Sequence, residues 1–223
     1  MITTILLSGG LDSTVLLHYL IKKQKINNLS ALSFSYGQRH TKELECAQWH
    51  TDNCGNVKEH KIISLDGLGT LLSGSSTLLE GGGEVPDLDE LSEEQLKHPP
   101  TYVPNRNMIM LSIAAAFAES RASTALYYAA QAHDRYSYWD CSADFVNSIN
   151  KTLALNKSCP VKVEAPFVNM KKYEVVSLGA ELDVDFSRTW SCYRGGTSPC
   201  GTCPTCKERQ AAFQQAQIED PLL

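Results

Sequence analysis

The sequence predicts an α/β protein built on a doubly wound parallel sheet. In the first 65 residues, short apolar segments at 3–7, 29–36 and 57–65 alternate with segments of helical spacing. Strands separated by helices are joined by right-handed crossovers, which produce a parallel sheet covered on both faces. The same alternation resumes after residue 104. A chain of 223 residues is long enough for one large domain or for a domain with a small appendage.

The pattern predicts the elements in chain order. The expected strands cover 3–7, 29–36, 57–65 and 123–132, with a short extended piece at 161–167. The expected helices cover 12–23, 41–54, 105–121, 142–155, 171–184 and 206–217. Residues 66–103 are rich in Gly, Pro and acidic side chains, so we expect an insert or mobile loop there. These expectations divide the chain into a main domain (1–188) and a cysteine-bearing tail with a terminal helix (189–223).

Charge and hydropathy limit the classes of partner. The net charge of -5 provides no broad cationic field, which argues against long nucleic acid as a partner. No apolar run approaches the ~20 residues of a membrane span. The first predicted strand begins beside Met1 and leaves no room for a signal peptide, so we expect a cytoplasmic protein.

The stretch TTILLSGGLDST joins the first strand to the first helix. A glycine turn at a helix N-terminus beyond a parallel strand can bind phosphate, and Ser8, Ser13 and Thr14 add hydroxyl donors. Asp12 faces a phosphate favourably only through a cation such as Mg²⁺. The alternative is a plain turn in which Asp12 or Ser13 caps the helix. The expected phosphate-binding residues are Leu7, Ser8, Gly9, Gly10, Leu11, Asp12, Ser13 and Thr14.

This loop resembles the SGGxDS loop of the PP-loop ATP pyrophosphatases, whose domains are adenine nucleotide alpha hydrolase-like. The resemblance implies ATP as a substrate. Such enzymes adenylate a substrate oxygen, release pyrophosphate, and let a nitrogen or sulfur nucleophile displace AMP.

Four cysteines crowd the end of the chain in the pattern C-x7-C-x2-C-x2-C. They are Cys192, Cys200, Cys203 and Cys206. Four thiolates complete a tetrahedral shell of the kind that holds a structural Zn²⁺. Free thiols or an iron–sulfur cluster are the alternatives.

Several segments in order resemble the QueC family of 7-cyano-7-deazaguanine synthases over essentially the whole chain. They are YGQRHTKELECA, TYVPNRNMIMLSIAAAFAE, DRYSYWDC, APFVNMKKYEVVSLGAEL and TWSCY with CGTCPTCKERQAAF. The resemblance implies that ATP adenylates 7-carboxy-7-deazaguanine, that ammonia displaces AMP to give an amide, and that a second ATP drives dehydration to the nitrile. Zn²⁺, Mg²⁺ and a homodimer are expected with it.

The resemblance also implies roles for individual residues. Asp12 is the expected Mg²⁺ ligand and acts with Ser13 of the same loop, while Arg39, Arg106 and Lys172 stabilise charge on phosphate or substrate carboxylate. The expected substrate-binding residues are Arg39, Arg106, Asn107, Asp134, Tyr138 and Asp140. The two aspartates suit the N–H edge of a guanine-like base, and the tyrosine suits stacking. The alternatives are surface charges, a helix cap at Asp140, and ordinary packing of the ring.

Four positions depart from the usual family pattern, and one of them, Ala129, stands at a strand end where glycine is common. Asn105 stands in place of glycine, Trp139 in place of proline, and Ser142 in place of arginine. A related enzyme that uses the same adenylation on another acceptor, such as a protein in an antiphage defence system, therefore stays open. A non-catalytic, zinc-stapled binding module is the third hypothesis, and the intact SGGLDST argues against it.

Overall fold

A parallel five-stranded sheet forms the centre of the protein. The computed structural model describes residues 2–39, 41–131 and 138–223. The strand order is β3-β2-β1-β4-β5, and every neighbouring pair is parallel. The strands are β1 (Thr3–Leu6), β2 (Leu29–Ser35), β3 (Val57–Ser64), β4 (Ala125–Tyr127) and β5 (Lys162–Glu164). The prediction of a parallel sheet is confirmed, although the strand expected at 123–132 keeps only three residues.

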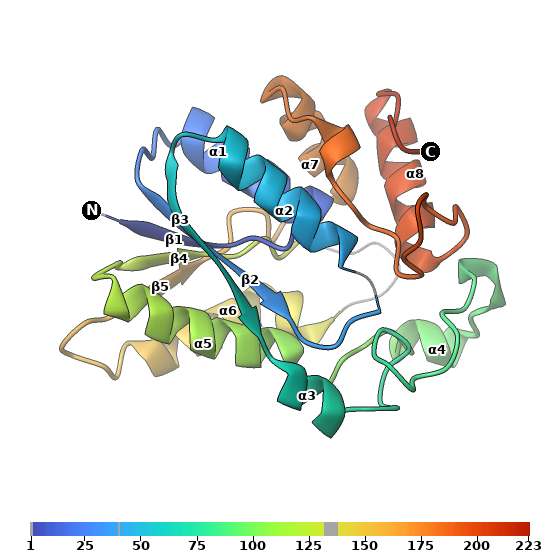
Figure 1. Cartoon of the computed structure of the whole chain (residues 1–223), viewed down its shortest axis with the longest axis horizontal. Coiled ribbons are helices and arrows are strands. Elements are labelled where there is room, and N and C mark those ends of the chain that lie inside the picture. The colour runs from blue at the N-terminus through green and yellow to red at the C-terminus, as the bar shows by residue number, and fades with distance from the viewer. Residues whose placement is uncertain (1, 40, 132–137) are drawn as a thin grey trace.

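Helices cover both faces of the sheet, as the doubly wound prediction requires (Figure 1). One face carries α1 (Leu11–Lys22), α2 (Lys42–Asn53), α7 (Lys172–Glu181) and α8 (Pro204–Ala216). The other face carries α5 (Arg106–Ser120) and α6 (Ala143–Leu153). Each face has its own apolar core. The first core includes Ile5, Leu17 and Phe213, and the second includes Leu126 and Phe145.

The segment 66–103 is more ordered than a loop. It contains α3 (Asp66–Leu71), a 3-10 turn (Leu88–Glu90) and α4 (Glu93–Lys97). Leu78 and Leu79 are buried in the second core, and Val85 is buried beside the cysteines. The expected insert therefore contains short helices of its own, and apolar residues spaced among the Gly and acidic positions anchor it. Its movement stays a prediction.

The cysteine-bearing tail shares the main core. Ala212 and Phe213 of α8 belong to the first core, and α8 lies beside α7. The helix begins at Pro204, two residues before the expected Cys206, because proline suits a first helical turn where no intrahelical N–H bond is needed. The division at residue 188 stays a prediction. Within the ranges that the structure describes, no helix is long and apolar enough to cross a membrane.

The β1–α1 loop lies at the point in the sheet where the strand order reverses. β2 and β3 extend to one side of β1, whereas β4 and β5 extend to the other. In open parallel sheets, ligands bind beyond the carboxyl ends of the strands at such a reversal. The segments that follow β1 and β4 are therefore the expected walls of a site.

Candidate active site

The loop between β1 and α1 is fixed by its own serines. Ser8 N–H donates to Ser13 Oγ at 3.2 Å, the two hydroxyl oxygens are 3.0 Å apart, and Ser13 O–H donates to Gly10 O at 3.2 Å. Gly10 is the N-cap of α1, and no described side chain caps this helix. The alternative of a turn capped by Asp12 or Ser13 therefore does not describe the loop. The first-turn N–H groups stay available to an anion.

Gly9 holds the loop between two other parts of the chain. Its φ is +84°, and a Cβ there would lie 1.8 Å from Glu43 O and 2.7 Å from Ala47 N, both backbone atoms of α2. On the other side, Trp190 N–H donates to Gly9 O at 3.1 Å. Only glycine combines this φ with this contact, so α2 and the segment before the cysteines together set the shape of the loop.

Asp12 and Lys172 form an ion pair at the edge of the loop. Lys172 Nζ lies 2.5 Å from Asp12 Oδ2, with the two side chains about one-fifth exposed. The other carboxylate oxygen, Asp12 Oδ1, is buried and has no hydrogen-bond donor among the described residues. An unpaired anionic oxygen beside a phosphate-binding loop fits a hard cation such as Mg²⁺.

A cavity of about 290 Å³ opens beside the loop. The predicted residues that line it are Leu7, Ser8, Gly10, Leu11, Asp12, Ser13, Arg106, Asn107, Tyr138, Asp140 and Lys172. Gly9 and Thr14 are buried and do not line the cavity. The structure thus brings most of the predicted ATP-loop and substrate residues to one space at the reversal of the sheet.

Arg106 is a cation at the start of α5 that faces aromatic rings. Its Nη1 donates to Tyr36 OH at 3.0 Å, and its guanidinium lies 5.6 Å from the centroid of that ring. It also interacts electrostatically with Tyr138 and Tyr193. Among the residues that the structure describes, Arg106 takes part in no ion pair. Its charge therefore suits a substrate anion.

Glu43, in the first turn of α2, places a carboxylate in the same cavity. Gln38 Nε2 donates to it at 3.4 Å, while Gln38 itself is held by Tyr36 N–H at 2.7 Å and by Phe34 O at 3.2 Å. Burial raises the pKa of Glu43 to about 7, and the positive charge of Arg106 opposes this rise. The group is therefore poised to exchange a proton near neutral pH.

The opposite wall combines an aspartate with aromatic rings. Asp140 is buried, and its carboxylate accepts the backbone N–H of Asn107. Burial raises its pKa, and Arg106 opposes the rise. Tyr138 OH is 2.9 Å from Thr101 Oγ1, and its ring stacks against that of Tyr102 at 6.3 Å with an interplanar angle of 24°. A flat base fits this wall better than a flexible chain does.

One predicted residue lies elsewhere, and another is not among the described residues. Arg39 is exposed, donates to Leu79 O at 3.4 Å and to Gly83 O, and does not line the cavity. It holds the 78–83 segment. Asp134 lies outside the described residues.

The sequence prediction also missed cavity residues. They include Tyr36, Gln38, Glu43, Tyr102, Tyr128, Tyr193 and Glu208. Glu43 stands in a segment that resembles the family, but without a structure nothing indicated that it reaches the loop. Tyr36 and Gln38 follow β2 in that same segment. Tyr102 precedes α5, Tyr128 follows β4, Tyr193 precedes α8 and Glu208 lies in α8, so the tertiary fold brings these four to the cavity.

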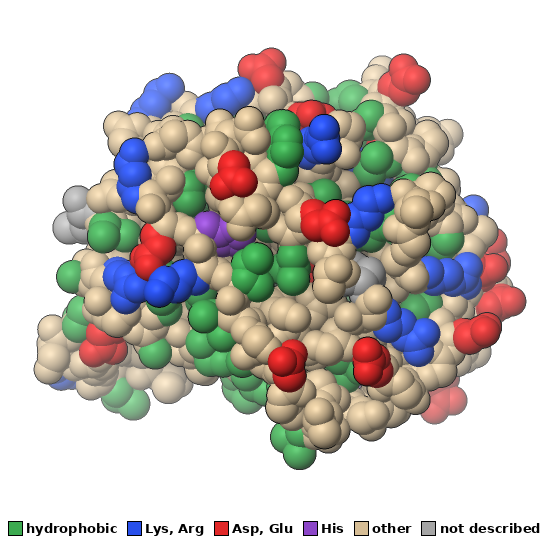
Figure 2. Space-filling view, viewed as in Figure 1, with side chains coloured by type: hydrophobic (Ala, Val, Ile, Leu, Met, Phe, Trp, Pro, Cys, Tyr) green, Lys and Arg blue, Asp and Glu red, His purple; other side chains and the backbone are tan. Residues whose placement is uncertain are grey.

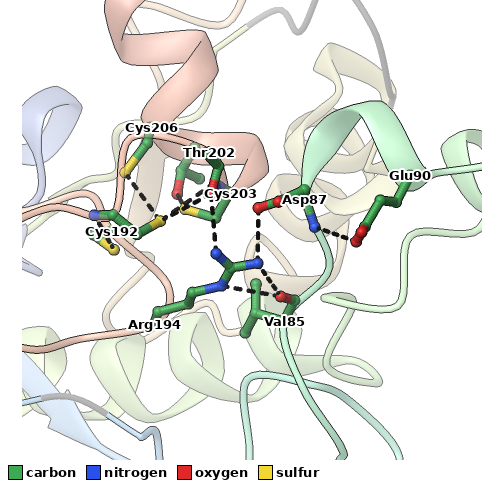
Figure 3. Close-up of polar contacts among 10 residues, drawn as sticks. Val85, Asp87, Glu90, Cys192, Arg194, Thr202, Cys203 and Cys206 are labelled. Atoms are coloured by element: carbon green, nitrogen blue, oxygen red, sulfur yellow. Dashed lines mark hydrogen bonds and ion pairs between the residues drawn. The ribbon is translucent and has the colours of Figure 1, made fainter.

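The four terminal cysteines converge, as predicted (Figure 3). Their sulfur atoms all lie within 4.8 Å of one another, and Cys192, Cys203 and Cys206 are buried. The Cys200 and Cys206 sulfurs are 3.9 Å apart, near the ~3.8 Å that tetrahedral zinc with bonds of ~2.3 Å requires. Backbone N–H groups of Cys200 and Cys203 donate to the sulfurs of Cys192 and Cys200. This cluster fits a thiophilic metal.

An arginine ties the cysteine region to the 66–103 segment. Arg194 donates to Val85 O at 2.7 Å, to Asp87 Oδ1 at 2.8 Å and to Thr202 Oγ1 at 2.9 Å (Figure 3). The neighbouring residues Ser191, Tyr193, Thr205 and Glu208 line the cavity. The cysteine cluster therefore supports one wall of the site.

The strand order and the SGGLDST loop define the fold class of this protein, a doubly wound α/β domain with a glycine–serine loop after its first strand. The U34-tRNA thiolase NcsA from Methanococcus maripaludis shares the fold with a TM-score of 0.50 and 20% identity, covering 97% of this chain and 65% of the thiolase. NMN synthetase from Francisella tularensis shares it with a TM-score of 0.51 and 16% identity, covering 97% of this chain and 77% of the synthetase. At these identities the likeness establishes the fold alone.

Comparison at the sequence level defines the family. The family profile described as "Queuosine biosynthesis protein QueC" matches residues 2–217. A 7-cyano-7-deazaguanine synthase from Caldicellulosiruptor saccharolyticus is 40% identical over 98% of this chain and 93% of its own length. Another from Archaeoglobus fulgidus is 42% identical over 98% of this chain and 88% of its own. The chain belongs to the QueC family.

Proposed function

We propose that this protein is an ATP-dependent ligase that converts 7-carboxy-7-deazaguanine and ammonia to 7-cyano-7-deazaguanine through adenylated intermediates, in queuosine-type deazapurine biosynthesis. One observation carries the proposal. In a chain of the QueC family, the SGGLDST loop, the Arg106 guanidinium and an aromatic wall all border one cavity of about 290 Å³. A carboxylate is a poor electrophile until adenylation gives it a good leaving group, and the groups that would bind ATP and the acid line the same cavity.

The loop would bind the phosphates of ATP. The N–H groups of the α1 N-terminus and the hydroxyls of Ser8 and Ser13 would contact the pyrophosphate portion. Asp12 Oδ1 would hold Mg²⁺, which when bound neutralises phosphate charge. Lys172, already paired with Asp12, would add a second positive charge at the same place.

The acid substrate would lie across Arg106. Its carboxylate would pair with the guanidinium, and its flat base would stack on Tyr138. Asn107 and Asp140 would border the base, although their mutual hydrogen bond also stabilises the start of α5. Roles for Arg39 and Asp134 at the substrate stay proposals without support from the described cavity.

Zinc is the proposed occupant of the four-cysteine site. Since all four ligand positions come from the protein, the ion would stabilise structure and would leave no open position for water. A homodimer and a cytoplasmic location complete the proposal, both on the family resemblance. Figure 2 shows acidic and basic side chains interspersed on the face drawn, consistent with a small-molecule substrate and no long nucleic acid.

The test is to incubate metal-replete protein with ATP, Mg²⁺, ammonium and 7-carboxy-7-deazaguanine and to follow the products by mass. The nitrile and two AMP per turnover are expected, and Asp12→Asn should abolish both. Asp52→Asn, an exposed change on α2, is the matched control. Adduct or amide without nitrile would support adenylation of another acceptor, such as a protein. Absence of AMP with folded protein would overturn the proposed enzyme.

A further inference from the structure

Four described carboxylates line the cavity, and three of them interact with neighbouring groups. Asp12 pairs with Lys172, and Asp140 accepts the N–H of Asn107. Glu208 of α8 has interactions of its own with neighbouring groups. Glu43 is different, because the hydrogen bond that it accepts from the Gln38 amide is long, at 3.4 Å. A carboxylate in this position has capacity for a further N–H donor.

The position of Glu43 relative to the other groups suggests which donor. Its backbone carbonyl contacts Gly9, so its side chain begins beside the phosphate-binding loop. Arg106 interacts electrostatically both with Glu43 and with Tyr138. The guanidinium that suits the substrate carboxylate thus lies near both the aromatic wall for the base and Glu43, and all three line one cavity. A nucleophile held by Glu43 would therefore be close to the carboxyl group that Arg106 binds.

The reaction needs a nucleophile that is protonated in solution. Ammonium has no lone pair, so one proton must leave before nitrogen can attack. A small cation with N–H donors also suits a buried carboxylate near a backbone carbonyl, here Phe34 O, which already accepts from Gln38.

We propose that Glu43 binds ammonium and removes its proton, making it the general base for amide formation. This inference rests on the proposed function. The Glu43 carboxylate accepts one proton from ammonium and leaves ammonia. The nitrogen lone pair then forms the C–N bond with the acyl-adenylate carbon, the C–O bond to AMP breaks, and AMP leaves with that electron pair. Nitrogen loses its further proton to solvent, and Glu43 returns its own proton to solvent.

The electrostatic surroundings agree with this role. The groups that act on Glu43 are Arg106, which lowers its pKa, and the Gln38 amide, which does the same by hydrogen bonding. Burial outweighs both and leaves the pKa at about 7. A base of this strength is ionised in a useful fraction at neutral pH and still binds a proton well, which is the compromise that general-base catalysis favours.

The test uses Glu43→Gln, which removes the charge at nearly constant volume. Glu45→Gln is the matched control, since Glu45 is exposed in the same first turn of α2. Three measurements are made on the full-length protein: acid-dependent exchange of pyrophosphate into ATP, amide formation with ammonium, and hydroxamate formation with hydroxylamine. Hydroxylamine is a neutral nucleophile at neutral pH and needs no prior deprotonation.

For Glu43→Gln we expect kcat/KM for ammonium to fall by about 100-fold or more, with exchange and hydroxamate formation unchanged. Glu43→Asp should recover part of the loss, and Glu45→Gln should behave as the parent protein. Equal losses with ammonium and hydroxylamine, or a loss of exchange, would overturn the base and make Glu43 a binding or structural residue. Absence of exchange in the parent protein would overturn the proposed function itself. Thermal unfolding of each variant shows whether any loss reflects unfolding.

Discussion

Substitution of Gly9 by alanine should destabilise the protein strongly and distort the ATP loop. A left-handed φ of +84° costs a side-chain-bearing residue about 1–2 kcal/mol. The added Cβ would also lie 1.8 Å from a backbone oxygen of Glu43, so α2 and the loop must separate. Overpacking of this kind costs about 1–3 kcal/mol. The free energy of unfolding should therefore fall by about 2–5 kcal/mol.

Urea denaturation of a glycine series measures the two contributions separately. Gly83 has a φ of +78° with nothing near its Cβ position, so Gly83→Ala should show only the conformational cost of about 1–2 kcal/mol. Gly55 has open space and no positive φ, so Gly55→Ala should change stability by less than about 1 kcal/mol. A Gly9→Ala variant no less stable than Gly83→Ala would refute the argument from the α2 contact. ATP binding should weaken only in the Gly9 variant.

Three further predictions concern other parts of the molecule. Asp220→Asn should cost about 3–5 kcal/mol in urea, because Arg209 is 1% exposed and loses its paired carboxylate, whereas Asp183→Asn in an exposed ion pair should cost less than about 1 kcal/mol. Burial lowers the pKa of His18 from 6.5 to about 4. Between these values the unfolded state binds more protons than the folded state, so stability should fall by up to about 3 kcal/mol as the pH drops from 6.5 to 4. The fall should be smaller in His18→Gln, and identical pH profiles would contradict the prediction. Cys203→Ser should lose bound metal by elemental analysis and lower the unfolding temperature of the parent protein, while a chelator should have no further effect on the variant.

The strands and helices with simple periodicity were predictable from the sequence. The first three strands agree with their predicted ranges to within one residue at each end, because each is separated from the next by a segment of helical spacing. The strand predicted at 123–132 stops at Tyr127 instead. Tyr128, Ala129 and Gln131 leave the sheet and line the cavity. Tyr128 and Ala129 have the composition of strand residues but form a cavity wall. The local sequence pattern does not distinguish these two structures.

The chemistry of individual residues predicted the site only where it is contiguous in sequence, whereas the family resemblance also indicated Arg106, Asn107, Tyr138, Asp140 and Lys172, which line the cavity. The SGGLDST loop and the cysteines are local patterns whose chemistry can be read directly from their spacing. Glu43 and Tyr36 reach the cavity from α2 and from the end of β2, so their role depends on how the loop packs. The loop packs so closely on α2 that a Cβ at Gly9 would clash with Glu43 O. A single sequence contains no comparable signal.

Three of the four departures from the family pattern, Asn105, Trp139 and Ser142, have structural explanations away from the cavity, whereas the fourth, Ala129, lines it. Asn105 has a φ of +54°, a left-handed conformation that asparagine tolerates better than most residues other than glycine. Ser142 Oγ accepts from Phe145 N–H at 3.1 Å and caps α6, and Trp139 donates from the surface to Tyr102 OH. None of these three residues lines the cavity. The loss of an arginine at Ser142 therefore changes a helix cap among the described contacts, and it provides no support for a different acceptor.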